Sequence, residues 1–311
     1  MAYIGIQKQI RKNNLNSVFL LIAFPALMLA MVYLFLFFTT QETYKTPEGE
    51  FARIAPFVIG ATGLWFLIAW KFNTAMINSA TGARPLERKE NKRIYNLVEN
   101  LCIANGIQMP KINVIEDDSL NAFASGISDS TYTVSLSRGI INKLNDDELE
   151  GVIAHELAHI RNRDVRLLII SIIFVGIFAF IANVAFSGLR FGAIGGNRSN
   201  NKNSAPVILI ILVLSAVAYF ISLLLRFGIS RSREYMADAG AAEMTRKPWA
   251  LASALRKISG DPLIEAVKNR DVAQMFIENP QLSGKKGVSI GSIFATHPPI
   301  QKRIAVLEQF A

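Results

Sequence analysis

Charged residues and cysteine are both scarce in this 311-residue sequence. Only 18% of its residues are charged and 51% are hydrophobic, and the mean hydropathy is +0.31. Soluble globular domains have about 25% charged residues, so this composition favours a membrane protein. The single cysteine, Cys102, excludes an internal disulfide framework, and its place in an amphipathic helical pattern predicts a buried structural thiol.

The sequence also contains no G-x-x-x-x-G-K-[ST] phosphate loop, so we expect no nucleotide as a cofactor or partner. Lys and Arg number 33 against 24 Asp and Glu, which gives a net charge of +9. The excess basic residues flank the apolar blocks of the sequence. There they indicate membrane topology and contact with anionic lipid, and no nucleic acid is expected as a partner.

Four uncharged apolar blocks are long enough to cross a membrane, at residues 17–38, 54–70, 167–186 and 207–225. For the shortest block, 54–70, a buried core helix is the alternative. Lys and Arg are concentrated in the flanks on one side of these blocks. By the positive-inside rule, both termini and the two long polar segments are therefore predicted to be cytoplasmic.

This pattern divides the chain into four parts. Two transmembrane hairpins alternate with two cytoplasmic segments that are expected to form one catalytic domain together. The parts are 1–70 (first hairpin), 71–166 (cytoplasmic), 167–225 (second hairpin) and 226–311 (cytoplasmic).

The first cytoplasmic segment begins with a predicted amphipathic helix at residues 87–104, which Asn105-Gly106 would end. Three short strands are predicted next, at 111–116, 121–126 and 131–137, and we expect them to form a small antiparallel sheet. An edge strand of this sheet could bind an extended peptide through its backbone.

An H-E-x-x-H motif follows on a predicted helix that Asn145 and Glu148 would cap. Residues four apart share one helix face, so His155 and His159 can bind one metal ion while Glu156 lies beside it. The chain has only three histidines, and a chance match is expected about once in a thousand such sequences. Two surface histidines on a helix are the alternative, which the apolar residues around the motif disfavour.

A hydrolytic zinc site needs a third protein ligand, and Glu234 is the best candidate. Asp238 lies one helical turn later, where it can accept a hydrogen bond from a zinc-bound histidine. The alternative is a solvated helix in which Glu234 pairs with Arg231 or Arg233. The H-E-x-x-H motif and Glu234 each lie only a few helical turns along the chain from the end of an apolar block. This predicts a site just above the cytoplasmic surface of the membrane.

These residues resemble the HtpX-type membrane zinc metalloproteases, which are gluzincins related to the prenyl-protein endopeptidases. The resemblance covers essentially the whole chain. It rests on residues 121–126, 155–159 with Asp164, 195–198, 230–239, and 296–299 with Arg303. It implies one zinc ion (Zn²⁺) per chain bound by His155, His159 and Glu234. Glu156 would be the general base and then the general acid, and Asp238 would support a zinc ligand.

The resemblance implies further roles. Asn121 and Phe123 would bind substrate along the edge strand, and His297 would stabilise the oxyanion that develops on the scissile carbonyl. For His297, a structural loop residue before Pro-Pro is the alternative. The fold class expected is an α-helical integral membrane protein with four transmembrane helices and a mainly α cytoplasmic gluzincin-type domain that contains the small antiparallel sheet.

We therefore expect a zinc metalloendopeptidase of the bacterial cytoplasmic (inner) membrane. Its substrates would be cytoplasmic regions of membrane or misfolded proteins, in quality control and stress response. Two alternatives remain, a site-specific processing peptidase for lipidated proteins and an inactive scaffold stabilised by zinc. The intact Glu156 argues against the scaffold. The ligand types alone also suit other divalent metal ions.

Overall fold

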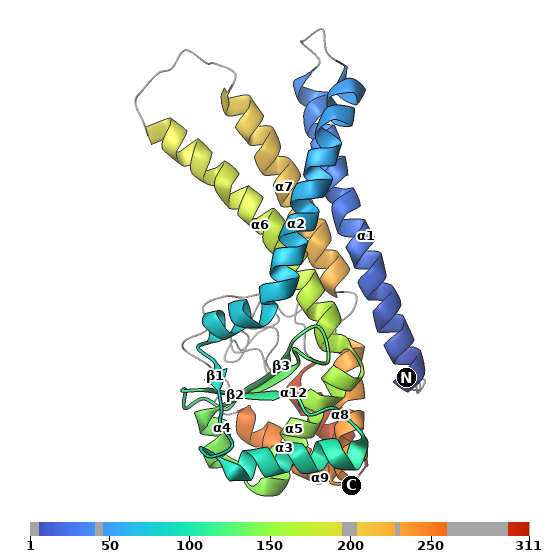
Figure 1. The fold of residues 1–311 in the computed structure, drawn as a ribbon, viewed down its shortest axis with the longest axis vertical. Helices are drawn as coiled ribbons and strands as arrows, with labels where there is room; N and C mark the ends of the chain where they lie inside the picture. The colour runs from blue at the N-terminus through green and yellow to red at the C-terminus, as the bar shows by residue number, and fades with distance from the viewer. Residues whose placement is uncertain (1–5, 41–45, 195–203, 228–230, 260–297, 311) are drawn as a thin grey trace. The chain divides into compact units, whose positions relative to one another are not determined.

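The computed structural model describes residues 6–40, 46–194, 204–227, 231–259 and 298–310. Its contacts separate the chain into two compact units, whose elements are labelled in Figure 1. The first unit comprises Met1–Asn14, Phe72–Ile169 and Ile229–Ala311, and the second comprises Leu15–Lys71 and Ile170–Gly228. The first unit is thus assembled from three stretches of chain that the second unit interrupts.

The second unit consists of long apolar helices. They are α1 (Ile6–Thr39), α2 (Pro47–Thr81), α6 (Asp164–Ile194) and α7 (Ser204–Phe227), of which α1, α2 and α6 extend from the first unit. Three stretches among the described residues are long and apolar enough to cross a membrane, Gln7–Thr39, Pro47–Thr81 and Asp164–Val184, and Leu209–Ile221 is a shorter apolar helix. Each of the four predicted spans thus coincides with a helix, and among the described residues three of these helices meet the length and apolarity needed to cross a membrane.

Aromatic side chains pack inside this helical unit. The Phe174 ring of α6 stacks on Phe24 of α1, with centroids 4.6 Å apart, and on Phe66 of α2 at 5.5 Å. On the outside, large apolar side chains such as Ile22 and Phe57 are 66% and 78% exposed. Such exposure is unfavourable in water and favourable in lipid, so the unit has the surface of a membrane domain.

The first unit contains a four-stranded sheet with the order β1-β2-β4-β3. The strands are β1 (Arg84–Pro85), β2 (Lys111–Ile115), β3 (Ala122–Ser125) and β4 (Thr133–Ser137). β1 is antiparallel to β2 and β3 is antiparallel to β4, but β2 and β4 are parallel. The prediction of a purely antiparallel sheet is therefore wrong.

The path of the chain after β2 explains the parallel pair. The loop that leaves β2 crosses the end of β4, where the Ser137 hydroxyl donates to the Ser119 carbonyl oxygen at 2.6 Å. It passes so close to Gly139 that a β-carbon there would overlap the Asp118 carbonyl oxygen. This crossing carries β3 to the far side of β4, so β3 occupies one edge of the sheet and β4 lies beside β2.

Helix α5 (Asp146–Arg161) is the centre of the first unit, where it contacts α3, α8, α9, β3 and β4 (Figure 1). The other helices of this unit are α3 (Lys92–Asn105), α4 (Arg138–Lys143), α8 (Arg231–Thr245), α9 (Pro248–Ile258) and α12 (Ile300–Glu308). α3 begins later than the predicted 87–104 because the Asn91 side chain caps it, and it ends as predicted at Gly106, which is left-handed.

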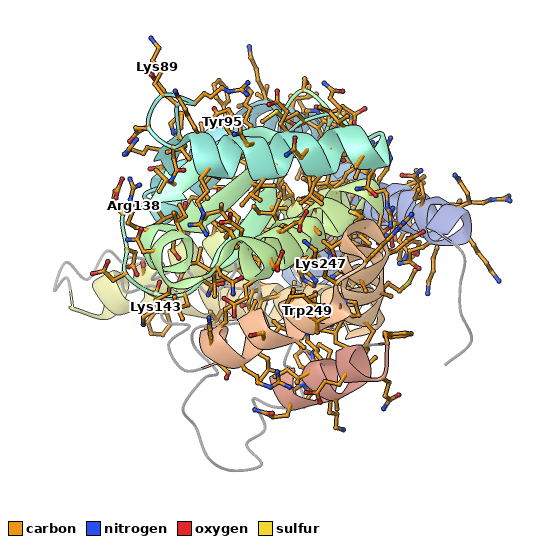
Figure 2. All side chains as sticks on the ribbon, turned by 90° about the horizontal axis from the view of Figure 1, so that it is seen from below. Lys89, Tyr95, Arg138, Lys143, Lys247 and Trp249 are labelled. Atoms are coloured by element: carbon orange, nitrogen blue, oxygen red, sulfur yellow. The ribbon has the colours of Figure 1, made fainter. Side chains whose placement is uncertain are left out.

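The start of α5 is fixed as the sequence predicts. The Asn145 side chain accepts from the Glu148 backbone N–H at 2.9 Å, and the Glu148 carboxylate accepts from the Asn145 N–H at 3.0 Å, which completes a capping box. Glu148 also accepts from Ser253 and Lys257 of α9 at 2.8 and 2.7 Å. Lys247, labelled in Figure 2, precedes α9 and forms ion pairs with two acidic residues in the first turns of α5. These contacts attach the beginning of the motif-bearing helix to α9.

Candidate metal centre

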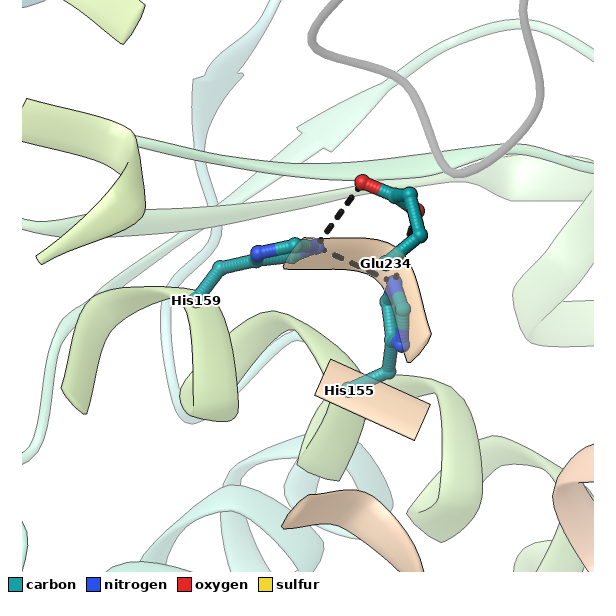
Figure 3. A group of neighbouring side chains, drawn as sticks. All are labelled: His155, His159 and Glu234. Atoms are coloured by element: carbon teal, nitrogen blue, oxygen red, sulfur yellow. Dashed lines mark hydrogen bonds and ion pairs between the residues drawn. The ribbon is translucent and has the colours of Figure 1, made fainter. Parts of the chain in front are cut away.

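Three potential metal ligands meet between α5 and α8 (Figure 3). They are His155, His159 and Glu234, each of which offers an atom within 4.8 Å of the others. The two histidine Nε2 atoms are 3.2 Å apart. The Glu234 carboxylate oxygens lie 3.5 Å from the His159 Nε2 and 3.7 Å from the His155 Nε2. The four-residue spacing on α5 places both imidazoles on one face, and α8 supplies the carboxylate opposite them.

Two further carboxylates contact the Nδ1 atoms of the imidazoles, on the sides that face away from the cluster. Asp238 Oδ1 is 3.0 Å from the His155 Nδ1, and Asp164 Oδ2 is 3.1 Å from the His159 Nδ1. Because a carboxylate accepts hydrogen bonds, these contacts favour a proton on each Nδ1, and each Nε2 faces the cluster as the atom that would bind a metal ion. The role expected of Asp238 thus has a matching contact, whereas the contact of Asp164 was not predicted.

Arg303 of α12 is a further site residue that the sequence analysis did not assign. It is 1% exposed, and its guanidinium donates to both oxygens of Asp238, at 2.7 and 2.9 Å. Its Nη1 is also 3.5 Å from the Glu234 Oε2. A sequence signal was present, because Arg303 shares a helix face with the buried Ile304 and Leu307, and a charged residue on an apolar face needs a partner.

The electrostatics of the cluster favour positive charge. Burial and the Arg303 guanidinium act against a protonated His155, but hydrogen bonds to Asp238 and Glu234 outweigh them and raise the pKa of His155 to about 9. Two imidazole nitrogens and one carboxylate oxygen are a typical donor set for a catalytic divalent metal ion. The residues present therefore fit a metal ion.

Glu156 is 2% exposed and faces the edge strand of the sheet. Burial raises the pKa of Glu156 above its ordinary value, and the charge of Glu234 acts in the same direction. The two imidazoles and a backbone hydrogen bond from Ala124 oppose this shift in part. Since Ala124 belongs to β3, an edge strand of the sheet among the described residues adjoins a carboxyl group whose pKa is raised.

The remaining predicted site residues lie on or before β3, or outside the described residues. Asn121 precedes β3 and is fully buried, and its side-chain oxygen accepts from the Ala122 N–H at 3.0 Å. Phe123 lies within β3 and is also fully buried. His297 lies outside the described residues, so its contact with substrate stays a prediction.

Comparison of the chain with known proteins identifies the family to which it belongs. The model of peptidase family M48 matches residues 88–311. A protease HtpX homolog of Bacteroides fragilis is 56% identical over all of both chains, and one of Dictyoglomus turgidum is 38% identical over 88% of this chain and 87% of its own. The crystal structure of S. mikatae Ste24p covers 97% of this chain and 67% of its own, with 20% identity and a TM-score of 0.49.

The family match includes both helices that carry the ligand cluster, and the identity to the B. fragilis protease extends through the apolar helices. The fold is mostly helical, with a small mixed sheet and several long apolar helices, which is consistent with a membrane metalloprotease. A protease acts on polypeptides, and this family uses a metal ion. The chain belongs to peptidase family M48, among the HtpX-type membrane proteases, and is a metallopeptidase.

Proposed function

We propose that the chain is a zinc endopeptidase that cuts exposed segments of membrane or misfolded proteins. The observation that carries this proposal is the placing of Glu156 between the His155, His159 and Glu234 cluster and the edge strand β3. This arrangement brings together a metal site, a buried base and a surface that can bind peptide backbone. The relatives from B. fragilis and D. turgidum are both named as proteases, which supports the same activity.

His155, His159 and Glu234 would hold one zinc ion, because three protein ligands leave a coordination position open in a tetrahedral site. Zinc supplies Lewis acidity, which activates water and polarises the scissile carbonyl. Asp238 and Asp164 keep the ring nitrogens that face away from the cluster protonated, so the facing nitrogens remain available. Arg303 in turn neutralises the buried charge of Asp238.

The substrate would bind as an extended strand along β3, which is an edge strand of the sheet among the described residues, since edge strands can pair with an added peptide through backbone hydrogen bonds. Backbone pairing is tolerant of sequence, which suits an enzyme with many substrates. Asn121 directly precedes β3 and Phe123 lies within it. We assign them to substrate binding and assign His297 to the scissile carbonyl oxygen.

Glu156 would move the proton during hydrolysis. Its carboxylate takes a proton from the attacking water and then gives it to the nitrogen of the departing amine. The new bond joins the water oxygen to the carbonyl carbon, and the bond that breaks is the peptide C–N bond. Burial, which raises the pKa of Glu156, makes the group able to carry the proton between these two steps.

We place the protein in the bacterial cytoplasmic membrane with four spans, at 17–38, 54–70, 167–186 and 207–225. Lys and Arg flank these spans mainly on one side, which supports cytoplasmic termini and a cytoplasmic active site. The resemblance to HtpX-type proteases supports a role in protein quality control under stress. Membrane and misfolded proteins with accessible extended segments would be the substrates.

The test uses full-length protein purified in detergent and an unfolded model protein as substrate. We expect fragments from the zinc-loaded wild type, and none after chelation or from Glu156→Gln. Glu243→Gln is the matched control, because that glutamate is on α8 and its side chain is 60% exposed. Cleavage at many positions supports the broad endopeptidase, whereas cleavage of one substrate at one position would favour a processing enzyme. Zinc binding without any cleavage would contradict the proposal.

A further inference from the structure

The N-terminal end of α1 contributes a buried amide to the first unit. Asn13 is 1% exposed, and its side-chain nitrogen donates to the Asp164 Oδ1 at 2.6 Å and to the Asn162 carbonyl oxygen at 2.8 Å. All three residues belong to the first unit. The two acceptors fix the orientation of the Asn13 amide, because only its nitrogen side can donate to both.

A second amide on the same face of α1 supports this orientation. Gln9 lies one helical turn before Asn13 and is 4% exposed. Its side-chain nitrogen donates to the Asn13 Oδ1 at 3.3 Å. Gln9, Asn13 and Asp164 therefore form a continuous buried hydrogen-bonded chain that begins outside the motif-bearing helices and ends at the carboxylate behind His159.

Asp164 divides its carboxylate between two partners. One oxygen accepts from Asn13, and the other is 3.1 Å from the His159 Nδ1. The residue lies directly after Arg163, which has a positive φ of 60° and separates α5 from α6. Arg233 of α8 donates to the Asp164 backbone carbonyl oxygen at 3.3 Å. Contacts from α1 and α8 thus determine where this carboxylate points.

We propose that Asn13 is a positioning residue of the metal centre, which acts through Asp164 to hold His159 in the orientation that binds metal. The inference rests on the proposed zinc site. Without the Asn13 amide, one buried oxygen of Asp164 loses its donor, and the carboxylate rotates to recover a partner. The hydrogen bond to the His159 ring then weakens, and the facing ring nitrogen becomes a poorer ligand.

The experiment measures zinc affinity by competition with a chelator, on full-length protein in detergent. Asn13→Leu keeps the branching and the number of side-chain heavy atoms but removes the donor. Asn14→Leu is the matched control, since Asn14 is the next residue and is exposed. We expect Asp164→Asn to lower the affinity about 10- to 100-fold, Asn13→Leu about 3- to 10-fold, and Asn14→Leu to leave it unchanged.

A double variant separates positioning from general stabilisation. If Asn13 acts through Asp164, adding Asn13→Leu to Asp164→Asn lowers the affinity no further. The absorption spectrum of the cobalt-loaded protein should also shift in Asn13→Leu and not in Asn14→Leu. A merely structural role would lower the unfolding temperature of the metal-free protein without moving this spectrum.

Zinc affinity of Asn13→Leu within twofold of the wild type, or equal losses in both backgrounds, would overturn the inference. If Asn13→Leu does not fold, Gln9→Leu decides, because it removes only the outer hydrogen bond of the chain. A weaker zinc affinity is then expected, and an unchanged affinity contradicts the inference. Failure of the wild type to bind zinc would instead contradict the proposed function.

Discussion

Ala158 of α5 and Gly240 of α8 approach so closely that a β-carbon on Gly240 would lie 3.0 Å from the Ala158 Cβ. The contact lies between the two helices that supply all three candidate ligands. Fully buried Ala237 and Ala241 continue the row of small residues on α8. The short distance from the Glu234 carboxylate to the imidazoles therefore depends on the absence of side-chain bulk at this contact.

Gly240→Val should consequently weaken the metal site. The added methyl groups separate α8 from α5, and we expect zinc affinity to fall at least about 10-fold and stability by about 1–3 kcal/mol. Gly63→Val is the control, because a β-carbon on that helical glycine meets no atom within 4 Å. Chelator competition measures the zinc affinity, and thermal unfolding measures the stability. A Gly240→Val protein with wild-type zinc affinity would show that the metal site does not depend on this close contact.

Glu156→Gln and Glu234→Ala should separate the base from the ligand. The first removes the proton acceptor but keeps all three ligand side chains, so we expect full zinc content and a loss of kcat of at least about 100-fold. The second removes a ligand, so zinc content and cleavage should both be lost. Atomic absorption gives the bound zinc. Normal zinc retention by Glu234→Ala would exclude that residue as a ligand.

Arg303→Met should destabilise the first unit. The substitution leaves the buried Asp238 carboxylate without its cationic partner, and such a loss costs about 3–5 kcal/mol. The neighbouring Lys302 is exposed, so Lys302→Met removes the same charge from the same helix without this cost. The measurement is the unfolding free energy in detergent. Equal stability of the two variants would show that the Arg303–Asp238 pair contributes nothing to the free energy of unfolding.

Glu148→Gln should make the stability of the first unit less dependent on pH. Burial acts to raise the pKa of Glu148, but hydrogen bonds from Lys257, the Asn145 N–H and Ser253 lower it below the ordinary 4.5. A lowered pKa stabilises the fold above about pH 4.5, and this contribution is lost as the pH falls through the folded value. We expect Glu148→Gln to cost about 1 kcal/mol at pH 7. Thermal unfolding from pH 8 to pH 3.5 should show the stability difference between wild type and Glu148→Gln becoming smaller as the pH falls. A difference that does not change with pH would contradict the stabilising role of the Glu148 carboxylate.

Cys102 should be unreactive in the folded protein. Burial raises the pKa of the Cys102 thiol to about 11, so almost no thiolate forms at pH 8. We expect a thiol reagent to label it more than about 100-fold faster after unfolding. The control is Ile103→Cys in a Cys102→Ala background, since Ile103 is 75% exposed. Rapid labelling of the folded wild type would show that the helix opens.

Local patterns were sufficient to predict the ligand-bearing helix. The four-residue spacing of His155 and His159 defines one helix face wherever the helix lies, and the capping box of Asn145 and Glu148 involves only residues within one turn. The positions of the three longer strands were predicted for the same reason. Their directions were not, because the parallel pair depends on a loop that crosses the sheet at Gly139.

The supports of the metal centre were harder to predict because they depend on contacts distant in sequence. Asn13 and Asp164 are 151 positions apart, and Arg303 and Asp238 are 65 apart. The break that frees Asp164 from α5 occurs at Arg163, without a glycine or proline to mark it. Periodicity within one segment carries no information on such pairs.

The three-stretch construction of the first unit also orders events during synthesis. The ribosome produces Leu15–Lys71 of the second unit and then the H-E-x-x-H helix, next the apolar stretch Ile170–Gly228, and only afterwards Glu234 and Arg303. At translation rates of about 5–20 residues per second, this leaves the nascent histidines without Glu234, their proposed third ligand, for on the order of ten seconds. With Glu234 in this proposed role, peptide hydrolysis begins only after α7 has been made, so a chain that is still being synthesised has no complete active site.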